Sequence, residues 1–316
     1  MSAAAAPTGG GHVHEAGFYR SDAEFGALVV DFIDSAVAAG EPVIIGFDRR
    51  KTDLIRSRIA DDTGVSFVGE SDHYSAPTRA IGSYQRQFEK HLAEGATRVR
   101  IAGEVPAAGT GRSFSGWDRY EAGINALWRE LPVWSRCIYD STALRPDVRD
   151  VVLRAHPRLV APDGRVVRSA DYEDPERFAF LPVEPHPFES APPTRRLVDC
   201  SPGGARTAIR ELGDGHVHPA VLDDLAYAAS EAVTNAHMYG GSPVTVRIWR
   251  AAARMLVTVH DTGPGPADRT VGLAPRPRTP DGAGLGLWVA HQLDVTTDLI
   301  WREDGFTVRL AAGEPA

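Results

Sequence analysis

The sequence predicts two α/β domains, and three observations support this fold class. Residues 12–160 alternate between strand-like and helix-like segments, which is typical of a mainly parallel sheet flanked by helices. Residues 194–316 combine amphipathic helical patterns with paired apolar strands, which is typical of helices packed on a mostly antiparallel sheet. Nine prolines between positions 156 and 202 prevent a continuous helix there, so we expect a proline-rich linker over residues 161–193.

Length and composition agree with a globular protein of two domains. The chain has 316 residues, of which 43% are hydrophobic and 24% are charged. It contains no apolar run near the roughly 20 residues that cross a bilayer, so we expect no membrane segment. Residues 1–11 are rich in alanine and glycine and lack the pattern of a signal peptide, which predicts a disordered tail and a cytoplasmic protein. A net charge of -8 argues against direct binding of nucleic acid.

The two cysteines, Cys137 and Cys200, give a further expectation. In a reducing compartment, free or buried thiols are favoured over a disulfide. Two cysteines also do not suggest a zinc cluster, and we expect none.

The alternating pattern of the N-terminal domain predicts each of its elements in order. The expected strands cover residues 14–18, 42–46, 65–68, 99–103 and 135–139. The expected helices cover residues 22–39, 51–63, 76–93, 117–129 and 146–155, and a short hairpin is expected around 165–168.

The C-terminal domain is predicted in the same way. Its expected strands cover residues 196–200, 244–250, 254–260, 296–302 and 306–310. Its expected helices cover residues 202–212, 219–239 and 282–293, and Pro219 marks the start of the longest one.

The helix expected over 219–239 carries Glu231 and Asn235, which are four residues apart and therefore share one helix face. Oxygen ligands suit Mg²⁺, which usually takes one or two protein ligands and completes its shell with water and phosphate oxygens. Asn235 is thus a candidate magnesium ligand, and Glu231 is a candidate general base for an attacking hydroxyl. The alternative is an exposed polar pair with no ligand.

Asp261 ends an expected strand and is followed by Gly263 and Gly265. A carboxylate beside bare backbone can accept a hydrogen bond from the exocyclic amine of adenine while the ring lies against the glycines. The alternative is a turn in which the aspartate accepts from its own backbone.

Three alternating glycines, Gly282, Gly284 and Gly286, stand at the start of the next expected helix, with Leu285 among them. Free N–H groups at a helix start receive phosphate oxygens. Glycine costs roughly 1 kcal/mol relative to alanine inside a helix, so three of them indicate the close approach of a ligand. The preceding loop contributes Arg269, Arg276 and Arg278 as candidate phosphate contacts, although a plain loop is the alternative.

In this order and spacing, the three motifs resemble the N, G1 and G2 boxes of the GHKL ATPase superfamily over about residues 194–311. The resemblance implies a Bergerat fold that binds ATP and Mg²⁺. It implies Asn235 on the magnesium, Glu231 as base, Asp261 on the adenine amine, and the G-box residues lining the pocket. The sequence Ser230 to Ala236 most resembles the anti-sigma-factor serine kinases. Two departures are a short proline-rich lid and Tyr239, at a position where those kinases usually carry histidine.

Residues 12–160 resemble the MEDS sensory domain through short motifs spread along the domain. These motifs are His12 to Glu15, Gly103-Glu104, Glu121, Tyr139-Asp140 and His156-Pro157. The resemblance implies sensing of a small molecule, and the candidate ligand contacts are His14, Glu15, Glu104, Glu121 and Tyr139. Glu104 and Glu121 are the better candidates, because ligands of open α/β sheets meet the carboxyl ends of strands. The alternative is that these side chains only cap turns or satisfy one another.

Together the two resemblances imply a signal-responsive regulator of transcription in a stress response. The expected partner is a sigma factor or a STAS-type anti-sigma antagonist, which the protein would phosphorylate on Ser or Thr; a homodimer is compatible with this assignment. One alternative is a sensor histidine kinase with His14 as phospho-acceptor. The other is a non-catalytic module whose binding depends on ATP.

Overall fold

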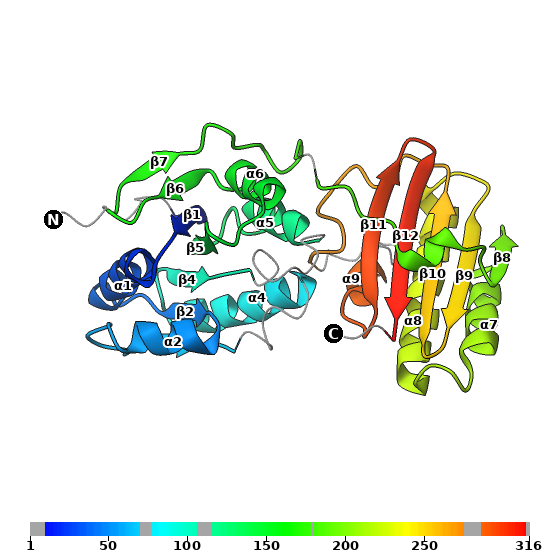
Figure 1. The fold of residues 1–316 in the computed structure, drawn as a ribbon, viewed down its shortest axis with the longest axis horizontal. Helices are drawn as coiled ribbons and strands as arrows, with labels where there is room; N and C mark the ends of the chain where they lie inside the picture. The colour runs from blue at the N-terminus through cyan, green and yellow to red at the C-terminus, as the bar shows by residue number, and fades with distance from the viewer. Residues whose placement is uncertain (1–9, 70–76, 106–115, 179, 275–285, 314–316) are drawn as a thin grey trace. The chain divides into compact units, whose positions relative to one another are not determined.

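The computed structural model describes residues 10–69, 77–105, 116–178, 180–274 and 286–313. The chain folds as two units, residues 1–181 and residues 182–316. Figure 1 shows the elements of both.

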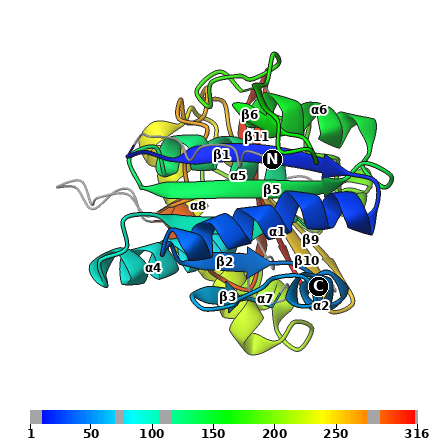
Figure 2. The same cartoon turned by 90° about the vertical axis from the view of Figure 1, so that its left-hand side faces the viewer.

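The N-terminal unit is built on a seven-stranded sheet in the order β3-β2-β4-β5-β1-β6-β7. All neighbouring pairs are parallel except β6 with β7. In the middle of the sheet β1 lies beside β5, as Figure 2 shows, and His14 is aligned with Ser135 in this pairing. The strands are β1 Val13–Tyr19, β2 Val43–Gly46, β3 Val65–Phe67, β4 Val99–Gly103, β5 Val133–Asp140, β6 Arg158–Val160 and β7 Val166–Arg168.

Helices cover both faces of this sheet (Figures 1 and 2). Helices α1 (Asp22–Ala38) and α2 (Arg49–Arg56) lie on one face, and their apolar residues join the strands in one buried core. The opposite face carries α4 (Pro77–Ala93), α5 (Trp117–Leu127) and α6 (Pro146–Ala155). Capping side chains determine where some helices begin. At the start of α1, the Ser21 side chain accepts a hydrogen bond from the N–H of Glu24.

The helix expected over 51–63 is shorter in the structure and ends at Arg56. Asp61 accepts from the backbone N–H and the hydroxyl of Thr63, which forms an Asx-type turn. Gly64 follows with φ +78°, a left-handed conformation that glycine adopts without strain. These turn-forming residues outweigh the helical pattern of the sequence.

The C-terminal unit is a layer of helices on a five-stranded, wholly antiparallel sheet in the order β11-β12-β10-β9-β8. Helices α7 and α8 bury their apolar sides against it in a second core. The strands are β8 Arg195–Val198, β9 Thr245–Ala251, β10 Arg254–Asp261, β11 Thr296–Arg302 and β12 Gly305–Ala312. The helices are α7 Pro202–Gly213, α8 Pro219–Tyr239 and α9 Gly286–Ala290.

Much of the segment expected to be a linker, residues 161–193, packs against one unit or the other. Strand β7 lies within it and extends the N-terminal sheet. Toward its other end the short 3₁₀ helix η2 (Pro187–Ser190) lies on the sheet of the C-terminal unit. There Glu189 accepts from Arg309 at 2.9 Å, and the indole N–H of Trp249 donates to the carbonyl of Ala191 at 2.8 Å.

The predicted fold class is confirmed: the N-terminal sheet is mainly parallel and the C-terminal sheet is antiparallel. Among the helices of the described residues, none combines the length and the hydropathy that a membrane span requires.

The central strand β1 carries polar side chains that are buried on both faces of the sheet. Glu15 is fully buried, and its Oε2 accepts two hydrogen bonds from the guanidinium of Arg136 on β5, at 2.8 and 3.1 Å. Arg136 also donates to the backbone carbonyl of Leu28 in α1 at 2.9 Å. The Nε of Arg158 lies 3.1 Å from the other carboxylate oxygen. A buried carboxylate is tolerated only with such partners.

Replacing Arg136 by alanine is expected to destabilise the N-terminal unit by about 3 kcal/mol, because it leaves Glu15 buried with only Arg158 as a cation. Hydrogen exchange of the β1 and β5 amides measures this local free energy of opening. The matched control is Arg50→Ala, which breaks an exposed 2.9 Å ion pair with Asp22 and should cost under about 1 kcal/mol. Equal losses in the two variants would contradict the assignment.

Candidate functional site

In the C-terminal unit, the predicted nucleotide site starts from one face of α8. Glu231 and Asn235 are both partly buried on this helix, and the neighbouring residues Ala232, Val233 and Ala236 pack into the core. The helix therefore fixes the two oxygen-bearing side chains one turn apart, at the edge of the packed layer.

The start of α9 lies directly against Glu231. A Cβ added at Gly286 would stand 2.5 Å from the Oε2 atom of Glu231, so only a glycine fits there without moving the carboxylate. The structure thus brings the first and third sequence motifs together. Gly282, Gly284, Leu285, Arg276 and Arg278 lie outside the described residues.

Asp261 closes β10 and is 4% exposed. Its Oδ1 accepts from the backbone N–H of Gly241 at 3.1 Å and from that of Gly263 at 2.8 Å. The bond to Gly263 is the local turn considered as the alternative, and the bond to Gly241 adds the loop after α8. Within the described residues both bonds go to one oxygen, so the carboxylate is held in place while its other oxygen has no such bond.

The backbone around Asp261 is packed closely enough to require glycine. A Cβ at Gly263 would lie 2.8 Å from Oδ1 of Asp261 and 3.0 Å from backbone atoms of Gly240 and Gly241. Gly265 has φ +70°, and a Cβ there would stand 2.7 Å from the ring of Phe306. The close approach of Asp261, the Gly240-Gly241 backbone and Phe306 therefore requires glycine at both positions.

Three further side chains lie in or close to these motifs in the sequence: Tyr239, His237 and Arg269. Tyr239 is 59% exposed at the end of α8. The Nε2 atom of His237 lies 2.9 Å from the carbonyl oxygen of Cys200, so this histidine is engaged with the loop before α7 and does not replace the one absent at Tyr239. Arg269 stacks over the ring of Trp301 at 4.3 Å.

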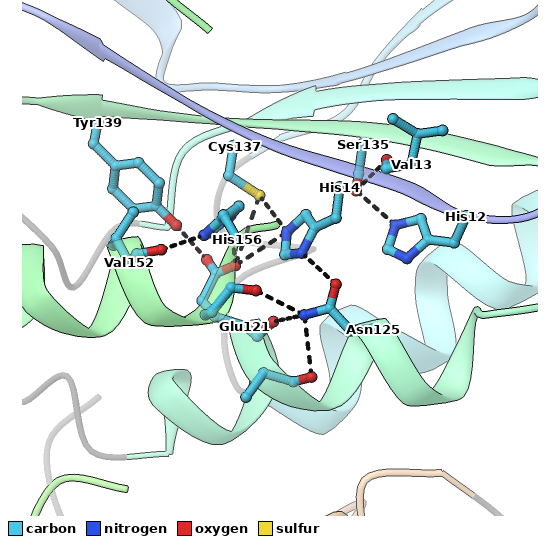
Figure 3. A network of polar contacts seen from close by, with 12 residues as sticks. His12, Val13, His14, Glu121, Asn125, Ser135, Cys137, Tyr139, Val152 and His156 are labelled. Carbon is cyan, nitrogen blue, oxygen red and sulfur yellow. Dashed lines mark hydrogen bonds and ion pairs between the residues drawn. The ribbon is translucent and has the colours of Figure 1, made fainter. Parts of the chain in front are cut away.

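In the N-terminal unit, a cluster of polar side chains comes from four elements (Figure 3). His14 lies on β1, Glu121 on α5, Cys137 and Tyr139 on β5, and His156 follows α6. The hydroxyl of Tyr139 donates to Oε1 of Glu121 at 2.6 Å. The other carboxylate oxygen, Oε2, lies 3.6 Å from Nε2 of His14 and 3.4 Å from Nε2 of His156.

Burial controls the ionisation of this cluster. It lowers the pKa of His14 to about 4, although the hydrogen bond with Asn125 opposes the shift. Burial and the neighbouring His14 lower the pKa of His156 to about 3. Burial also raises the pKa of the Glu121 carboxyl and of the Cys137 thiol. Both imidazoles are therefore neutral near pH 7, which is the form that binds metals.

The five residues predicted as sensor contacts do not form one site. His14, Glu121 and Tyr139 lie together, whereas Glu15 points to the opposite face of β1, toward α1. Glu104 follows β4 and is paired with Lys51, the nitrogen of which lies 5.8 Å from the ring of Tyr19. Neighbouring residues in a strand face opposite sides, which separates Glu15 from His14.

Two residues of the cluster, Cys137 and His156, were not predicted as site residues. His156 belongs to a motif that carries the sensor resemblance, and this was the available signal. The two cysteines predicted no zinc cluster, yet the structure brings together His14, Glu121, Cys137 and His156, which offer four ligand atoms within 4.8 Å of one another. Counting cysteines missed them because only one of the four is a cysteine.

An open groove of about 500 Å³ lies beside the cluster. His14 belongs to both the groove and the cluster, and its side chain is buried. The groove is lined by His12, Val13, His14, Pro157, Arg158, Val166, Val167 and Arg168.

Each of the two units matches the model of a known protein family. Residues 13–157 match the family model of MEDS, the methanogen/methylotroph, DcmR sensory domain. Residues 202–312 match the model of the histidine kinase-like ATPase domain. The chain joins a MEDS domain to a histidine kinase-like ATPase domain.

Other comparisons add less. Comparison with curated proteins finds no match. Among solved structures, the chain is similar to the NMR structure of the histidine kinase domain of the E. coli osmosensor EnvZ, with 21% identity over 39% of this chain and 91% of that chain, and a TM-score of 0.25. Such values carry no functional conclusion.

The ATPase domain implies ATP, usually with Mg²⁺, and the residues present fit this ligand. Asn235 and Glu231 supply the oxygen donors that magnesium prefers. Asp261 supplies a fixed acceptor for an amine, and Gly263 supplies bare backbone beside it. When bound, the nucleotide would provide a phosphoryl group for transfer, and these residues would hold and orient it.

Replacing Gly263 by alanine is expected to weaken ATP binding by about 10-fold or more, because the added methyl would meet Asp261 and fixed backbone within hard contact. Titration with a fluorescent ATP analogue measures the change. Gly203→Ala in α7 is the matched control: its nearest contacts would be 3.9 Å away, so affinity should be unchanged. An unchanged affinity in Gly263→Ala would contradict the placement of the adenine.

Proposed function

We propose that the protein is a signal-responsive switch in which the ATPase domain binds ATP with Mg²⁺ and regulates a sigma factor. It would do so by holding the sigma factor or by phosphorylating a Ser or Thr of a STAS-type anti-sigma antagonist. The observation that carries the proposal is the contact between Gly286 and Glu231, on the same helix face as Asn235. This contact joins a candidate base, on the helix face of a candidate magnesium ligand, to the last glycine of the third motif.

Each residue has a defined part in the proposed reaction. Asn235 would help to hold the magnesium, and Asp261 would accept from the adenine amine. Glu231 would take the proton from the attacking hydroxyl, as a carboxylate within reach of that hydroxyl can. Partly exposed and without a hydrogen bond to another described residue, Glu231 is available for this work.

The histidine kinase alternative depends on a phospho-acceptor, and His14 was the candidate. The side chain of His14 is 1% exposed, and it lies within 3.0 Å of Asn125 and 3.5 Å of Cys137. A buried histidine with these neighbours cannot reach the phosphate of a nucleotide without local unfolding. This observation favours an acceptor on another protein.

A non-catalytic, ATP-dependent binding module is the second candidate. Tyr239 stands where the related kinases usually carry histidine, and His237 is turned toward Cys200. An active site that lacks that group would still bind ATP and could use it to order the partner-binding surface.

The proposed setting is the cytoplasm, where ATP and sigma factors are present, and the net charge of -8 favours protein partners over nucleic acid. The proposed signal is a small molecule at the MEDS domain, for which the groove beside His14 is a candidate site. A homodimer is compatible with this function.

Phosphotransfer from labelled ATP to a purified STAS-type antagonist tests the catalytic form of the proposal. Glu231→Gln is expected to lower the transfer rate by about 10²-fold or more, which is the contribution of a general base, while ATP affinity changes by less than about 3-fold. Glu211→Gln, which alters an exposed carboxylate paired with Arg195, is the control and should transfer normally. Normal transfer by Glu231→Gln would overturn the assignment of the base.

Capture of a sigma factor distinguishes a kinase from a non-catalytic, ATP-dependent binding module. If the module is non-catalytic, ATP and a non-hydrolysable analogue will support equal capture and no antagonist will be phosphorylated. If the protein is a kinase, phosphorylated antagonist will appear with ATP only. Capture that is the same with and without nucleotide, together with no transfer, would contradict both forms.

A further inference from the structure

The buried cluster of the N-terminal unit has the composition and the dimensions of a metal site. Its four candidate ligand atoms are Nε2 of His14, Oε2 of Glu121, Sγ of Cys137 and Nε2 of His156, and all lie within 4.8 Å of one another. We propose that these four side chains bind one zinc ion. Imidazole nitrogen, thiolate and carboxylate are all zinc ligands.

Four of the six separations between these atoms agree with the edges of a tetrahedron around zinc. Bonds of about 2.0–2.1 Å to nitrogen and oxygen and of about 2.3 Å to sulfur give edges of about 3.4 Å between nitrogen and oxygen and about 3.6 Å to sulfur. The observed distances from Oε2 of Glu121 are 3.4 Å to His156 and 3.6 Å to His14. The Sγ of Cys137 lies 3.5 Å from Nε2 of His14 and 3.7 Å from Oε2 of Glu121.

Hydrogen bonds to groups outside the cluster orient each imidazole so that a nitrogen lone pair points toward the centre of the cluster (Figure 3). Nδ1 of His156 lies 2.8 Å from the carbonyl of Val152, which can only accept. Nδ1 of His14 lies 3.0 Å from Oδ1 of Asn125, and the amide group of Asn125 is oriented by its donation to the carbonyl of Ala155 at 2.7 Å. Both Nδ1 atoms therefore carry the proton, and both Nε2 atoms are free to bind a cation.

Hydrogen bonds among the four side chains do not satisfy all four candidate ligand atoms. Nε2 of His156 is buried without a hydrogen-bond partner in the described part of the chain. A proton on Glu121 could serve only one of the two imidazoles, and separations of 3.4 and 3.6 Å exceed those of hydrogen bonds to a carboxyl oxygen. The thiol of Cys137 can donate to His14 but not to His156 as well. A single cation satisfies all four atoms at once.

The carboxylate of Glu121 is also prepared for this role. Tyr139 donates to Oε1 at 2.6 Å, which leaves Oε2 for the ion. Supporting hydrogen bonds of this kind are typical around metal ligands. On binding, the metal replaces the proton of the Cys137 thiol, which passes to solvent. Four protein ligands leave no open position, so the site is of the structural type and would join β1, β5, α5 and the end of α6.

Metal content of the full-length wild-type chain, freed of any affinity tag, is the first test. After removal of metal with a chelator, reloading with zinc and desalting, we expect about one zinc ion per chain by mass spectrometry of the metal. Loading with Co²⁺ should give the strong visible bands of tetrahedral cobalt and a near-ultraviolet thiolate charge-transfer band. No retained zinc, or the weak spectrum of octahedral cobalt, would overturn the proposal.

A matched pair of cysteine variants identifies the thiolate. Cys137→Ser should lose the charge-transfer band, whereas Cys200→Ser, which changes the other cysteine, should keep both the band and the zinc. A band that persists in Cys137→Ser, or that disappears only in Cys200→Ser, would overturn the assignment.

A second, conservative pair of variants tests the proposal even if Cys137→Ser does not fold. Tyr139→Phe removes only the hydroxyl that supports Glu121 and is expected to weaken zinc binding by about 10- to 100-fold in competition with a chromophoric chelator. Tyr227→Phe changes a 42% exposed tyrosine of α8 and should bind zinc as the wild type does. Equal affinities in the two tyrosine variants would contradict the proposed ligand set.

Discussion

The N-terminal domain depends on the parallel pairing of β1 with β5 at the centre of its sheet. In a strand, successive side chains face opposite sides, so His14 faces α5 and Glu15 faces α1. Both side chains are buried, and a buried polar group is tolerated only where partners reach it. The partners of Glu15 come from β5 and β6, and those of His14 from α5, β5 and the end of α6. The register of β1 with β5, the placement of α5 and α6 and the composition of the polar cluster therefore depend on one another.

Local patterns in the sequence were sufficient to predict most of the elements. The helix at 219–239 and the strand at 99–103 have the predicted bounds, because a proline start and a short apolar run between polar residues are local signals. The helix expected over 51–63 failed where Asp61, Thr63 and Gly64 form a turn. The placement of Glu231 and Asn235 on one face followed from helical periodicity alone. The approach of Glu231 to Gly286 depends on tertiary packing, which the order of the motifs could only suggest.

The proposed metal-binding cluster could not be predicted from local sequence patterns, for a physical reason. His14 and Cys137 are separated by 123 positions, and the parallel register that aligns their strands is set by the hydrophobic faces of the whole sheet. Glu15 was grouped with His14 through the motif His12 to Glu15, which carries the sensor resemblance. The alternation of side chains along a strand places the two on opposite faces of the sheet.

The two candidate sites also differ in how a ligand could enter and leave. Glu231 and Asn235 are only partly buried, so a nucleotide can exchange there without disturbing the core. In the N-terminal cluster, His14, Glu121 and His156 are buried and Cys137 is partly buried, so an ion bound among them would be shielded from solvent. Such an ion would act as part of the fold. A signal that must bind and dissociate is better served by the open groove of about 500 Å³, where His14 forms part of the wall. Because Val13 and His14 of β1 line the groove, a molecule bound there would lie against the strand that holds the domain together.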